Sequence, residues 1–240
     1  FIAESLGAEQ QQITLPPEES AHAIKVRRMR VGDPVHVTNG SGLLAQGVIS
    51  AVESKPEAVV VEITSLTQRT APGISLTLAF AIPKGERQAT LLDMTVQLGV
   101  DSFIPLECEF SAVRFQNKMR ERWLRIAHSA CKQSRQVHIP KIETPKTVST
   151  LLSELDAKTL VVFGDQHGES IYQASKGIIS PLNHIVLLIG PEGGFSESEQ
   201  SILATFPGAH AIGASDHILR TETAAIALVT LAVQLRKLLS

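Results

Sequence analysis

The chain has little cysteine, no long apolar run and almost no net charge, and each absence excludes a class of protein. Its two cysteines, Cys108 and Cys131, supply neither a disulfide framework nor metal-ligand spacing, so we expect plain thiols and no metal site. The longest apolar stretch, residues 224–235, is interrupted by Thr230 and Gln234 and is too short to cross a bilayer. No charged-then-apolar leader opens the sequence. These absences predict a cytoplasmic protein with no membrane partner.

The charge balance gives no general sign of a nucleic-acid partner. The 240 residues carry 22 Lys and Arg against 24 Asp and Glu, a formal net charge of −2, so any such partner must be argued from local patches. Hydrophobic residues make up 43% of the chain and charged residues 19%, which is enough for a buried core. The length is long for one domain and comfortable for two. The chain starts at Phe1 without a methionine, which leaves open whether residues precede it.

Residues 1–70 are typical of a small β-barrel domain. Residues 34–38 alternate between apolar and polar, Asn39-Gly40-Ser41-Gly42 predicts a hairpin turn, and residues 43–52 and 58–64 can pair after it. Short strands with polar turns and no long helix suit a barrel. Pro72 and Gly73 lie next to each other in a polar stretch, so we place the domain boundary there.

Residues 71–240 show the alternation of an α/β domain. Residues 74–82 predict a strand, residues 86–98 a helix closed by Gly99, and residues 100–106 a second strand, which together indicate a parallel sheet. Residues 151–155 look helical. The chain ends in a helix through Leu238 that is apolar nearly all round, so it needs burial on more than one side. A second subunit that covers part of this helix would make the protein a homodimer.

Residues 185–199 form the stretch that most strongly predicts a ligand pocket. Five apolar residues indicate a strand buried on both faces, and Gly190 with Pro191 ends it. Gly193 and the glycine after it have no Cβ, so a ligand can approach the backbone closely. Ser196 and the glutamate three residues later match a capping box, so a helix starts at once. Strand, glycine loop and helix N-terminus build pockets in α/β proteins; the alternative is a tight turn without a ligand.

The kind of ligand follows from what this loop lacks. It matches neither G-x-x-x-x-G-K-[ST] nor G-x-G-x-x-G, and it has no lysine to meet a phosphate. Glu192 would repel a pyrophosphate and suits a ligand with hydroxyls, an amine or a positive centre. Two further strands, residues 159–163 and 210–212, run into Gly164 and Gly213, so three strand-ending glycines recur about once per strand-plus-helix unit. We expect their three loops to surround one pocket.

Two segments are locally basic. Four cations fall within residues 25–30, which predicts either a clamp on nucleic-acid phosphates or a solvated basic helix face. Residues 114–135 hold seven Lys or Arg and a single acid, Glu121. On a helix, the cations Lys118, Arg122, Arg125 and Lys132 share one face, and Met119, Trp123, Ile126 and Ala130 share another. The second segment therefore predicts a packed helix that presents cations to RNA or DNA.

Two long motifs resemble one protein family. Leu187-Leu-Ile-Gly-Pro-Glu-Gly-Gly-Phe195 and Ile218-Leu-Arg-Thr-Glu-Thr-Ala-Ala225 resemble the 16S ribosomal RNA uridine-N3 methyltransferases (RsmE-type) of the SPOUT superfamily. The likeness extends to residues 81–85, 97–100 and 133–135, and to the basic N-terminal segment that runs into Val31-Gly32-Asp33. Two departures stand out. Thr95-Val-Gln97 replaces the expected Ala-Thr-Glu, and the usual Glu-Arg-Ser is not intact in Glu107-Cys-Glu-Phe-Ser111, which removes an arginine suited to contact RNA.

The resemblance implies a fold and a partner set. It implies a PUA-like, RNA-binding β-barrel over residues 1–70, followed by a SPOUT α/β methyltransferase domain over residues 71–240 whose C-terminal part forms a trefoil knot. It also implies S-adenosyl-L-methionine as cofactor, 16S rRNA of the small ribosomal subunit as substrate, and an obligate homodimer. Two alternatives are a non-catalytic RNA-binding or ribosome-assembly factor and a nucleotide-dependent oxidoreductase, although the second lacks a dinucleotide fingerprint.

The implied chemistry requires positioning more than a reactive enzyme group. A sulfonium methyl is already activated, so no metal and no covalent enzyme intermediate is expected, and alignment supplies the catalysis. Uridine N3 lies on the Watson–Crick edge and carries a proton, so the base must be unpaired and N3 deprotonated. Arg220 is the candidate to stabilise the resulting anion, and Glu222 the candidate to assist proton removal. The alternative role for Glu222 is a helix-N-terminal acid.

The candidate binding residues follow from these motifs. The cofactor is expected to meet backbone groups or apolar walls at Phe163, Gly164, Leu188, Ile189, Gly190, Glu192, Gly193, Gly194, Ile212, Gly213, Ile218 and Leu219. Within that set Phe163, Ile189, Ile212 and Ile218 are expected to line the adenine slot. The RNA is expected to contact Lys25, Arg27, Arg28, Arg30, Arg122, Arg125 and Arg135.

Overall fold

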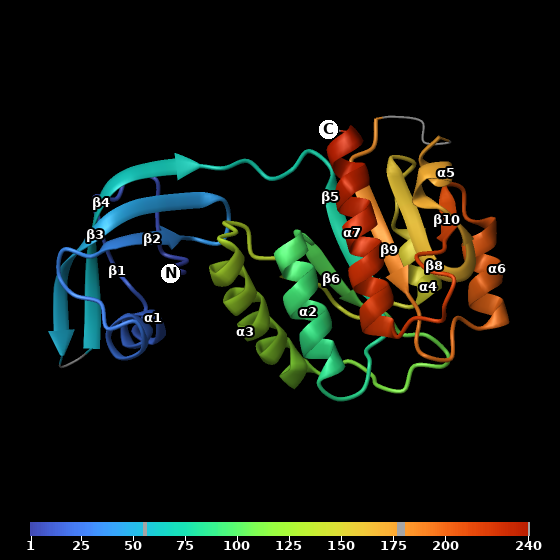
Figure 1. Ribbon diagram of the computed structural model, residues 1–240, viewed down its shortest axis with the longest axis horizontal. Coiled ribbons are helices and arrows are strands. Elements are labelled where there is room, and N and C mark those ends of the chain that lie inside the picture. Colours follow the sequence, from blue (N-terminus) through green and yellow to red (C-terminus); the bar gives the residue numbers. More distant parts are fainter. Residues whose placement is uncertain (55–56, 177–180, 240) are drawn as a thin grey trace. The chain divides into compact units, whose positions relative to one another are not determined.

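The chain forms two compact units in the computed structural model, which describes residues 1–54, 57–176 and 181–239 (Figure 1). The first unit contains Phe1–Ala71 and the later segment Cys131–Ile139. The second contains the residues from Pro72 to Ala130 and from Pro140 onward. A boundary placed near residue 70 therefore describes the first unit only in part, because nine residues from far along the chain also pack into it.

The first unit is built on an antiparallel sheet in the order β1-β4-β3-β2. Its elements are β1 (Gln12–Thr14), α1 (Pro17–Ala21), the π-helical turn η1 (His22–Val26), β2 (Pro34–Thr38), β3 (Leu43–Ser54) and β4 (Glu57–Gln68). The β3–β4 register shifts after Gln46 and again after Ile49, and such bulges bend a strand pair. Val37, Ala45 and Val61 lie in the buried core of this sheet. The predicted antiparallel N-terminal domain is confirmed.

The predicted hairpin turn after β2 is confirmed, and it also holds the distant segment. The Asn39 carboxamide oxygen accepts hydrogen bonds from the backbone N–H of Ser41 (2.8 Å) and of Leu43 (3.1 Å). Gly42 donates its N–H to the Val137 carbonyl (3.0 Å), and Ile139 donates to the Gly40 carbonyl (2.9 Å). Residues 131–139 thus join the first unit through backbone pairing, which the local composition of the sequence does not reveal.

The second unit is a parallel sheet in the order β10-β8-β9-β5-β6-β7, as the strand–helix alternation predicts. Its elements are β5 (Ser75–Phe80), α2 (Arg87–Leu98), β6 (Ser102–Pro105), α3 (Asn117–Ser134), β7 (Lys141–Ile142), α4 (Val148–Ser153), β8 (Thr159–Glu169), α5 (Ile171–Lys176), β9 (His184–Ile189), α6 (Glu197–Thr205), β10 (Ala209–Ile212) and α7 (Thr221–Leu239). The last turn of α3 belongs to the first unit. Gly99 closes α2 with φ of 97°, which glycine adopts at little cost.

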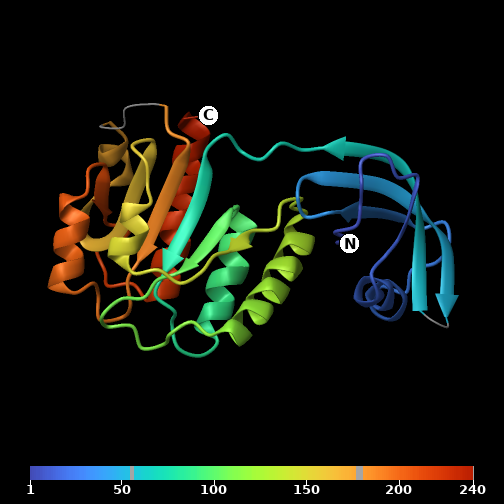
Figure 2. The same ribbon diagram turned by 180° about the vertical axis from the view of Figure 1, so that it is seen from behind.

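Helices cover both faces of this sheet, so its central strands are apolar along their length. Val186 and Leu188 of β9 pack in one cluster with Leu151 of α4 and Leu203 of α6. The helices α2 and α7 pack against each other on the other face, where α7 also contacts β5 and β9 (Figure 2). The predicted strand 185–189 is therefore buried on both sides. The knot that the resemblance implies stays a prediction.

The strand that we expected to end at Gly164 is longer. β8 continues to Glu169, and its extension pairs with Ile212 at the end of β10 after a shift in register. Gly168 makes the close approach possible, because an added Cβ would lie 2.5 Å from the carbonyl carbon of Ala211. The sequence prediction was wrong here because Gly164 sits within the strand and a second glycine further on makes the close contact.

Candidate active site at the carboxyl edge of the sheet

The carboxyl ends of β8, β9 and β10 meet at one edge of the sheet around a cavity of about 270 Å³. Phe163, Ile189 and Ile212, the residues at which the three predicted strands run into glycine, all line this cavity. Parallel strands place their carboxyl ends at the same edge, which is where α/β proteins bind ligands. The three segments that follow Phe163, Ile189 and Ile212 thus reach one cavity, although the first is a continuation of β8 and not a loop.

Most residues of the expected cofactor set line the cavity. The set found there is Phe163, Gly164, Ile189, Gly190, Glu192, Gly194, Ile212, Ile218 and Leu219. Three expected residues lie elsewhere. Leu188 points into the sheet core, since alternate residues of a strand face opposite sides. Gly213 lies against the Gly168 carbonyl, and Gly193 lies against Phe110.

The cavity has further walls that the sequence motifs did not indicate. Asp165 and Gln166 line it from β8, and Gln200 from α6. Other members of the lining are Pro191, Phe195, Ala214, Ser215, His217, Thr221, Ala224 and Leu228. Leu228 reaches the cavity from the second turn of α7, and only the packing of that helix on the sheet places it there. The residues after Gly164 could have been found by following the strand beyond its first glycine.

The loop between β9 and α6 is held by its own contacts. Gly190 packs against the Phe195 ring, since an added Cβ would lie 3.2 Å from Phe195 Cε2. Gly194 has φ of 76° and donates its N–H to the Pro191 carbonyl (2.9 Å). The capping box is present: the Glu199 carboxylate accepts from the Ser196 N–H (2.8 Å) and the Ser196 hydroxyl accepts from the Glu199 N–H (3.4 Å). These contacts within the loop fix its shape.

Arg87 links two carboxylates beside the cavity. Its Nη1 atom lies 3.4 Å from Glu192 Oε1, and its Nε atom lies 3.8 Å from Glu222 Oε1. Sequence reasoning treated Glu192 as a free charge for a cationic ligand, and this ion pair corrects that interpretation, because part of the charge is already balanced. Arg87 itself was missed, since its role depends on two residues far away in the sequence.

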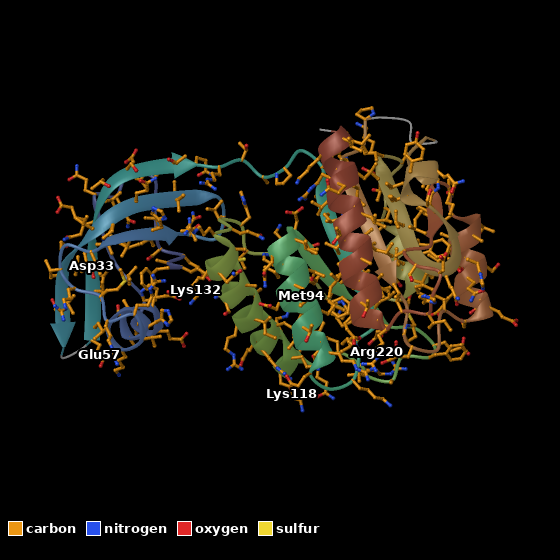
Figure 3. All side chains as sticks on the ribbon, viewed as in Figure 1. Asp33, Glu57, Met94, Lys118, Lys132 and Arg220 are labelled. Atoms are coloured by element: carbon orange, nitrogen blue, oxygen red, sulfur yellow. The ribbon has the colours of Figure 1, made fainter. Side chains whose placement is uncertain are left out.

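The two candidate catalytic residues lie two positions apart at the start of α7. Arg220 is exposed, and its carbonyl accepts from the Ala224 N–H (2.8 Å), so it directly precedes the helix (Figure 3). Glu222 lies in the first turn of α7 with its side chain 13% exposed. Its Oε2 atom is buried, and among the described residues it has no hydrogen-bond partner. An unsatisfied buried oxygen is unfavourable and commonly marks a functional group.

The basic segment of the first unit is exposed but is not a regular helix face. The helix α1 continues into η1, and the chain then turns at Arg28, which has φ of 53°. Arg27 and Arg135 line a common hollow of about 390 Å³ together with Lys132. Lys25 differs from the arginines, because its ammonium lies 2.9 Å from Glu57 Oε1. The structure thus brings Arg27 and Arg135 together and gives Lys25 an acidic partner.

The helix α3 has the predicted apolar and cationic faces, but one part of the prediction needs correction. Trp123 is fully buried and stacks on Phe80 with ring centroids 5.2 Å apart, whereas Arg125 is exposed. We expected this segment to lack acids that pair with its cations. Arg122 instead lies 2.8 Å from Glu86, and Lys132 lies 2.7 Å from Glu19. Both acids come from other segments, so counting charges within the helix could not reveal them.

The two cysteines are buried thiols without bonds to each other. Burial, with a smaller effect of the nearby Glu199 carboxylate, raises the pKa of Cys108 to about 12. Burial raises the pKa of Cys131 to about 11. The described part of the chain contains no group of three or more His, Cys, Asp or Glu placed to hold a metal ion. No helix among the described residues is long and apolar enough to cross a membrane.

Comparison with known proteins agrees with this architecture. Residues 70–233 match the RNA methyltransferase domain family, and residues 15–63 match the RNA methyltransferase PUA domain family. Ribosomal RNA small subunit methyltransferase E of Bacillus subtilis is 30% identical over 217 residues, which cover 86% of this chain and 84% of the relative. The enzyme of the same name from Rickettsia conorii is 28% identical and covers 92% of this chain and 89% of its own length.

Two solved structures are similar over nearly the whole chain. Ribosomal RNA small subunit methyltransferase E from Neisseria gonorrhoeae, bound to S-adenosyl methionine, has a TM-score of 0.84 at 26% identity and covers 95% of this chain and 94% of that one. A methyltransferase from Legionella pneumophila in complex with the same cofactor has a TM-score of 0.81 at 28% identity, with coverage of 95% and 94%. Both domain families match this chain, and its relatives share one name and a cofactor-binding fold. The chain therefore belongs to the ribosomal RNA small subunit methyltransferase E family.

Proposed function

We propose that this protein transfers a methyl group from S-adenosyl-L-methionine to N3 of a uridine in 16S rRNA of the small ribosomal subunit. The observation that carries the proposal is the cavity at the carboxyl edge of the sheet, beside which Glu222 has a buried carboxylate oxygen with no hydrogen-bond partner among the described residues. The family supports catalysis over the non-catalytic alternative. A substrate in the ribosome would place the protein in the cytoplasm.

The residues of the cavity fit this cofactor. Its volume of about 270 Å³ is close to the lower end of the range of roughly 300–1,000 Å³ for small-molecule sites. Phe163, Ile189 and Ile212 offer apolar walls suited to adenine, and the glycine loops expose backbone polar groups for hydroxyls. The β9–α6 loop has no lysine, which agrees with a ligand that has no phosphate. When bound, S-adenosyl-L-methionine supplies a methyl group that is already activated by its sulfonium.

The residues at the start of α7 provide the remaining chemistry in our proposal. Glu222 Oε2, which lacks a partner in the described structure, accepts the proton from uridine N3. Arg220 is exposed and has no ion pair among the described residues, so its guanidinium is free to stabilise the negative charge on the uracil ring. Arg87 holds the other Glu222 oxygen and so orients the carboxylate. Alignment of the uracil base and the methyl donor by these residues supplies the rest of the catalysis.

The cofactor assignment is tested by calorimetric titration of S-adenosyl-L-methionine into glycine variants. Gly194 lines the cavity with φ of 76°, and no atom lies within 4 Å of an added Cβ. Gly32 in the first unit has φ of 93° and is equally open, so Gly32→Arg imposes the same backbone strain at a residue that does not line the cavity. We expect Gly194→Arg to abolish binding and Gly32→Arg to preserve it. Unchanged affinity of Gly194→Arg would remove this loop from the site.

The catalytic assignment is tested by Glu222→Gln, which keeps the shape of the side chain but removes the base. We expect the turnover number to fall about 100-fold or more while cofactor affinity is retained, since general bases contribute roughly that much. The assay is radiolabelled methyl transfer to small ribosomal subunits from cells that lack the protein, with the product base mapped by mass spectrometry. Full turnover by Glu222→Gln would exclude it as the base, and a product other than N3-methyluridine would exclude the proposed atom.

The RNA surface in our proposal consists of the cations that have no acidic partner. Arg27, Arg28, Arg30, Arg125 and Arg135 are exposed, and no ion pair of theirs is found in the parts of the chain that the structure describes. Each phosphate contact that is removed should reduce the slope of log affinity against log salt by about 0.7–0.9. Charge-removing variants at these five positions should do so, whereas Lys25→Gln and Arg122→Gln should change the slope less. Equal slopes for the two groups would contradict the assignment.

We also propose that the protein is a homodimer that covers part of α7. Ile226, Leu231 and Val233 of this helix are only half-buried, and Ile218 at the cavity mouth is 85% exposed. Met94 of the neighbouring α2 is exposed as well (Figure 3). Burial of this apolar surface by a second copy would stabilise a dimer. Sedimentation equilibrium should give twice the chain mass, and Met94→Glu should shift it toward the monomer; a monomer for the unaltered protein would refute the proposal.

A further inference from the structure

We propose that Phe110 is a stacking platform for a base of the substrate RNA at the entrance to the methyl-transfer site; this inference rests on the proposed function. The side chain is 52% exposed although it belongs to a large apolar residue. It lies in the connection that follows β6, whose carboxyl end lies at the same edge of the parallel sheet as those of β5 and β9. The platform is therefore on the edge that forms the cavity.

A short hydrogen-bonded turn fixes the position of Phe110. Cys108 donates its N–H to the Ser111 hydroxyl (2.9 Å), and Ser111 donates its N–H back to the Cys108 carbonyl (3.1 Å). Glu109 donates its N–H to Glu199 Oε1 (3.0 Å). Since the other oxygen of that carboxylate accepts from the N-cap of α6, one buried side chain ties the Phe110 turn to the loop that lines the cavity. The exposed ring thus sits on a rigid support.

Phe110 rests directly on the cavity loop. A Cβ added to Gly193 would lie 3.4 Å from Phe110 Cβ and 3.7 Å from its Cδ2, so one side of the aromatic residue contacts the glycine backbone. The neighbours of this glycine, Glu192 and Gly194, line the cavity. The ring therefore lies against a loop whose other residues line the cavity, and its exposed surface is placed, in our proposal, to meet a nucleotide next to the reacting base.

The chemistry of this position favours a base over other partners. Glu109 is exposed beside the ring, and its carboxylate repels RNA phosphates, so the contact suits the face of an uncharged base. Unstacked RNA bases are commonly held on aromatic rings or on arginine guanidinium planes. The exposed aromatic ring of Phe110 therefore suits the face of an unpaired base.

The test is steady-state methylation of small ribosomal subunits by Phe110→Ala, Phe110→Tyr and Ile202→Ala. Ile202 is a control because it is an exposed apolar residue of α6. We expect Phe110→Ala to raise KM for the subunit, or lower kcat/KM, by about 10- to 100-fold, because loss of one stacked base has effects of that order. Phe110→Tyr should restore the activity, and Ile202→Ala should match the unaltered protein. Calorimetric affinity for S-adenosyl-L-methionine and sedimentation mass should be unchanged in all three.

Several results would overturn the platform. One is an unchanged kcat/KM in Phe110→Ala, and another is a loss of cofactor affinity that accompanies the loss of activity. A third is a shift of sedimentation mass in Phe110→Ala, which would assign the ring to a contact between two copies of the chain. Failure of the proposed function is a separate result, because it requires that the unaltered protein transfers no methyl group to the subunit. An active unaltered protein with an equally active Phe110→Ala would refute the platform alone.

Discussion

Substituting the buried Glu199 by alanine should destabilise the second unit. The carboxylate of Glu199 is buried, with the residue 9% exposed. It accepts hydrogen bonds from the backbone N–H groups of Ser196 (2.8 Å) and Glu109 (3.0 Å). Alanine removes both acceptors and leaves two backbone donors without a partner.

The magnitude follows from these two bonds. A buried donor that loses its acceptor costs about 1–3 kcal/mol, and loss of a helix cap costs about 1 kcal/mol, a cost that overlaps with the Ser196 bond. We therefore expect Glu199→Ala to lower the free energy of unfolding by about 2–4 kcal/mol. Glu199→Gln keeps one acceptor oxygen, so about half of that loss is expected.

Urea unfolding monitored by far-ultraviolet circular dichroism measures this difference, with the slope compared between variants so that a change in stability is separated from a change in the exposed surface. Glu197→Ala is the matched control, since Glu197 lies in the same first turn of α6 but is exposed. Removing its interaction with the helix dipole should cost only about 0.3–1 kcal/mol. A loss below about 1 kcal/mol for Glu199→Ala, or one equal to that of the control, would refute the reasoning about buried donors.

Three further predictions address the cavity, the ion-pair bridge and the thiols. Gly168→Ala should lower the affinity for the cofactor at least about tenfold, because an added Cβ would lie 2.5 Å from the backbone of β10. Gly73→Ala is the control and should leave the affinity unchanged, because no atom lies within 4 Å of its added Cβ. Equal affinities of the two variants would contradict the close approach. Arg87→Gln should lower the turnover number in the methyl-transfer assay about tenfold, and Arg87→Lys should lower it less, since the ion pair of Arg87 orients the Glu222 carboxylate. Unaltered turnover in both variants would exclude a positioning role for Arg87. At pH 8 iodoacetamide should modify native Cys108 and Cys131 about three and two orders of magnitude more slowly than an ordinary thiol, because their pKa values are raised from 9.0 to about 12 and about 11. The same raised pKa values contribute stability that is present below about pH 9 and is lost as the pH rises toward 12, so the midpoint of urea unfolding should fall over that range. Rapid labelling of the folded protein, or a midpoint that does not change, would show that the thiols are not buried as described.

Features that depend on a few neighbouring residues could be predicted from the amino-acid sequence alone. The Asn39–Gly42 hairpin, the left-handed Gly99 that closes α2, and the Ser196 capping box were predictable, because turn, φ and capping preferences act over a few residues. The continuous apolar run of β9 indicated burial on both faces, and three glycine-ended strands indicated a shared pocket. Two long motifs were specific enough to indicate the family.

Contacts between groups from distant segments became visible in the folded structure and not in the sequence. It continued β8 beyond Gly164, gave Arg122 an acidic partner, and joined residues 131–139 to the first unit. It also placed Arg87 between two carboxylates and tied the Phe110 turn to α6 through a single buried side chain. Each of these contacts joins residues that lie far apart along the chain, and its geometry depends on how sheet and helices pack. Local sequence preferences carry no information about such pairings, so they became visible only once the chain was folded.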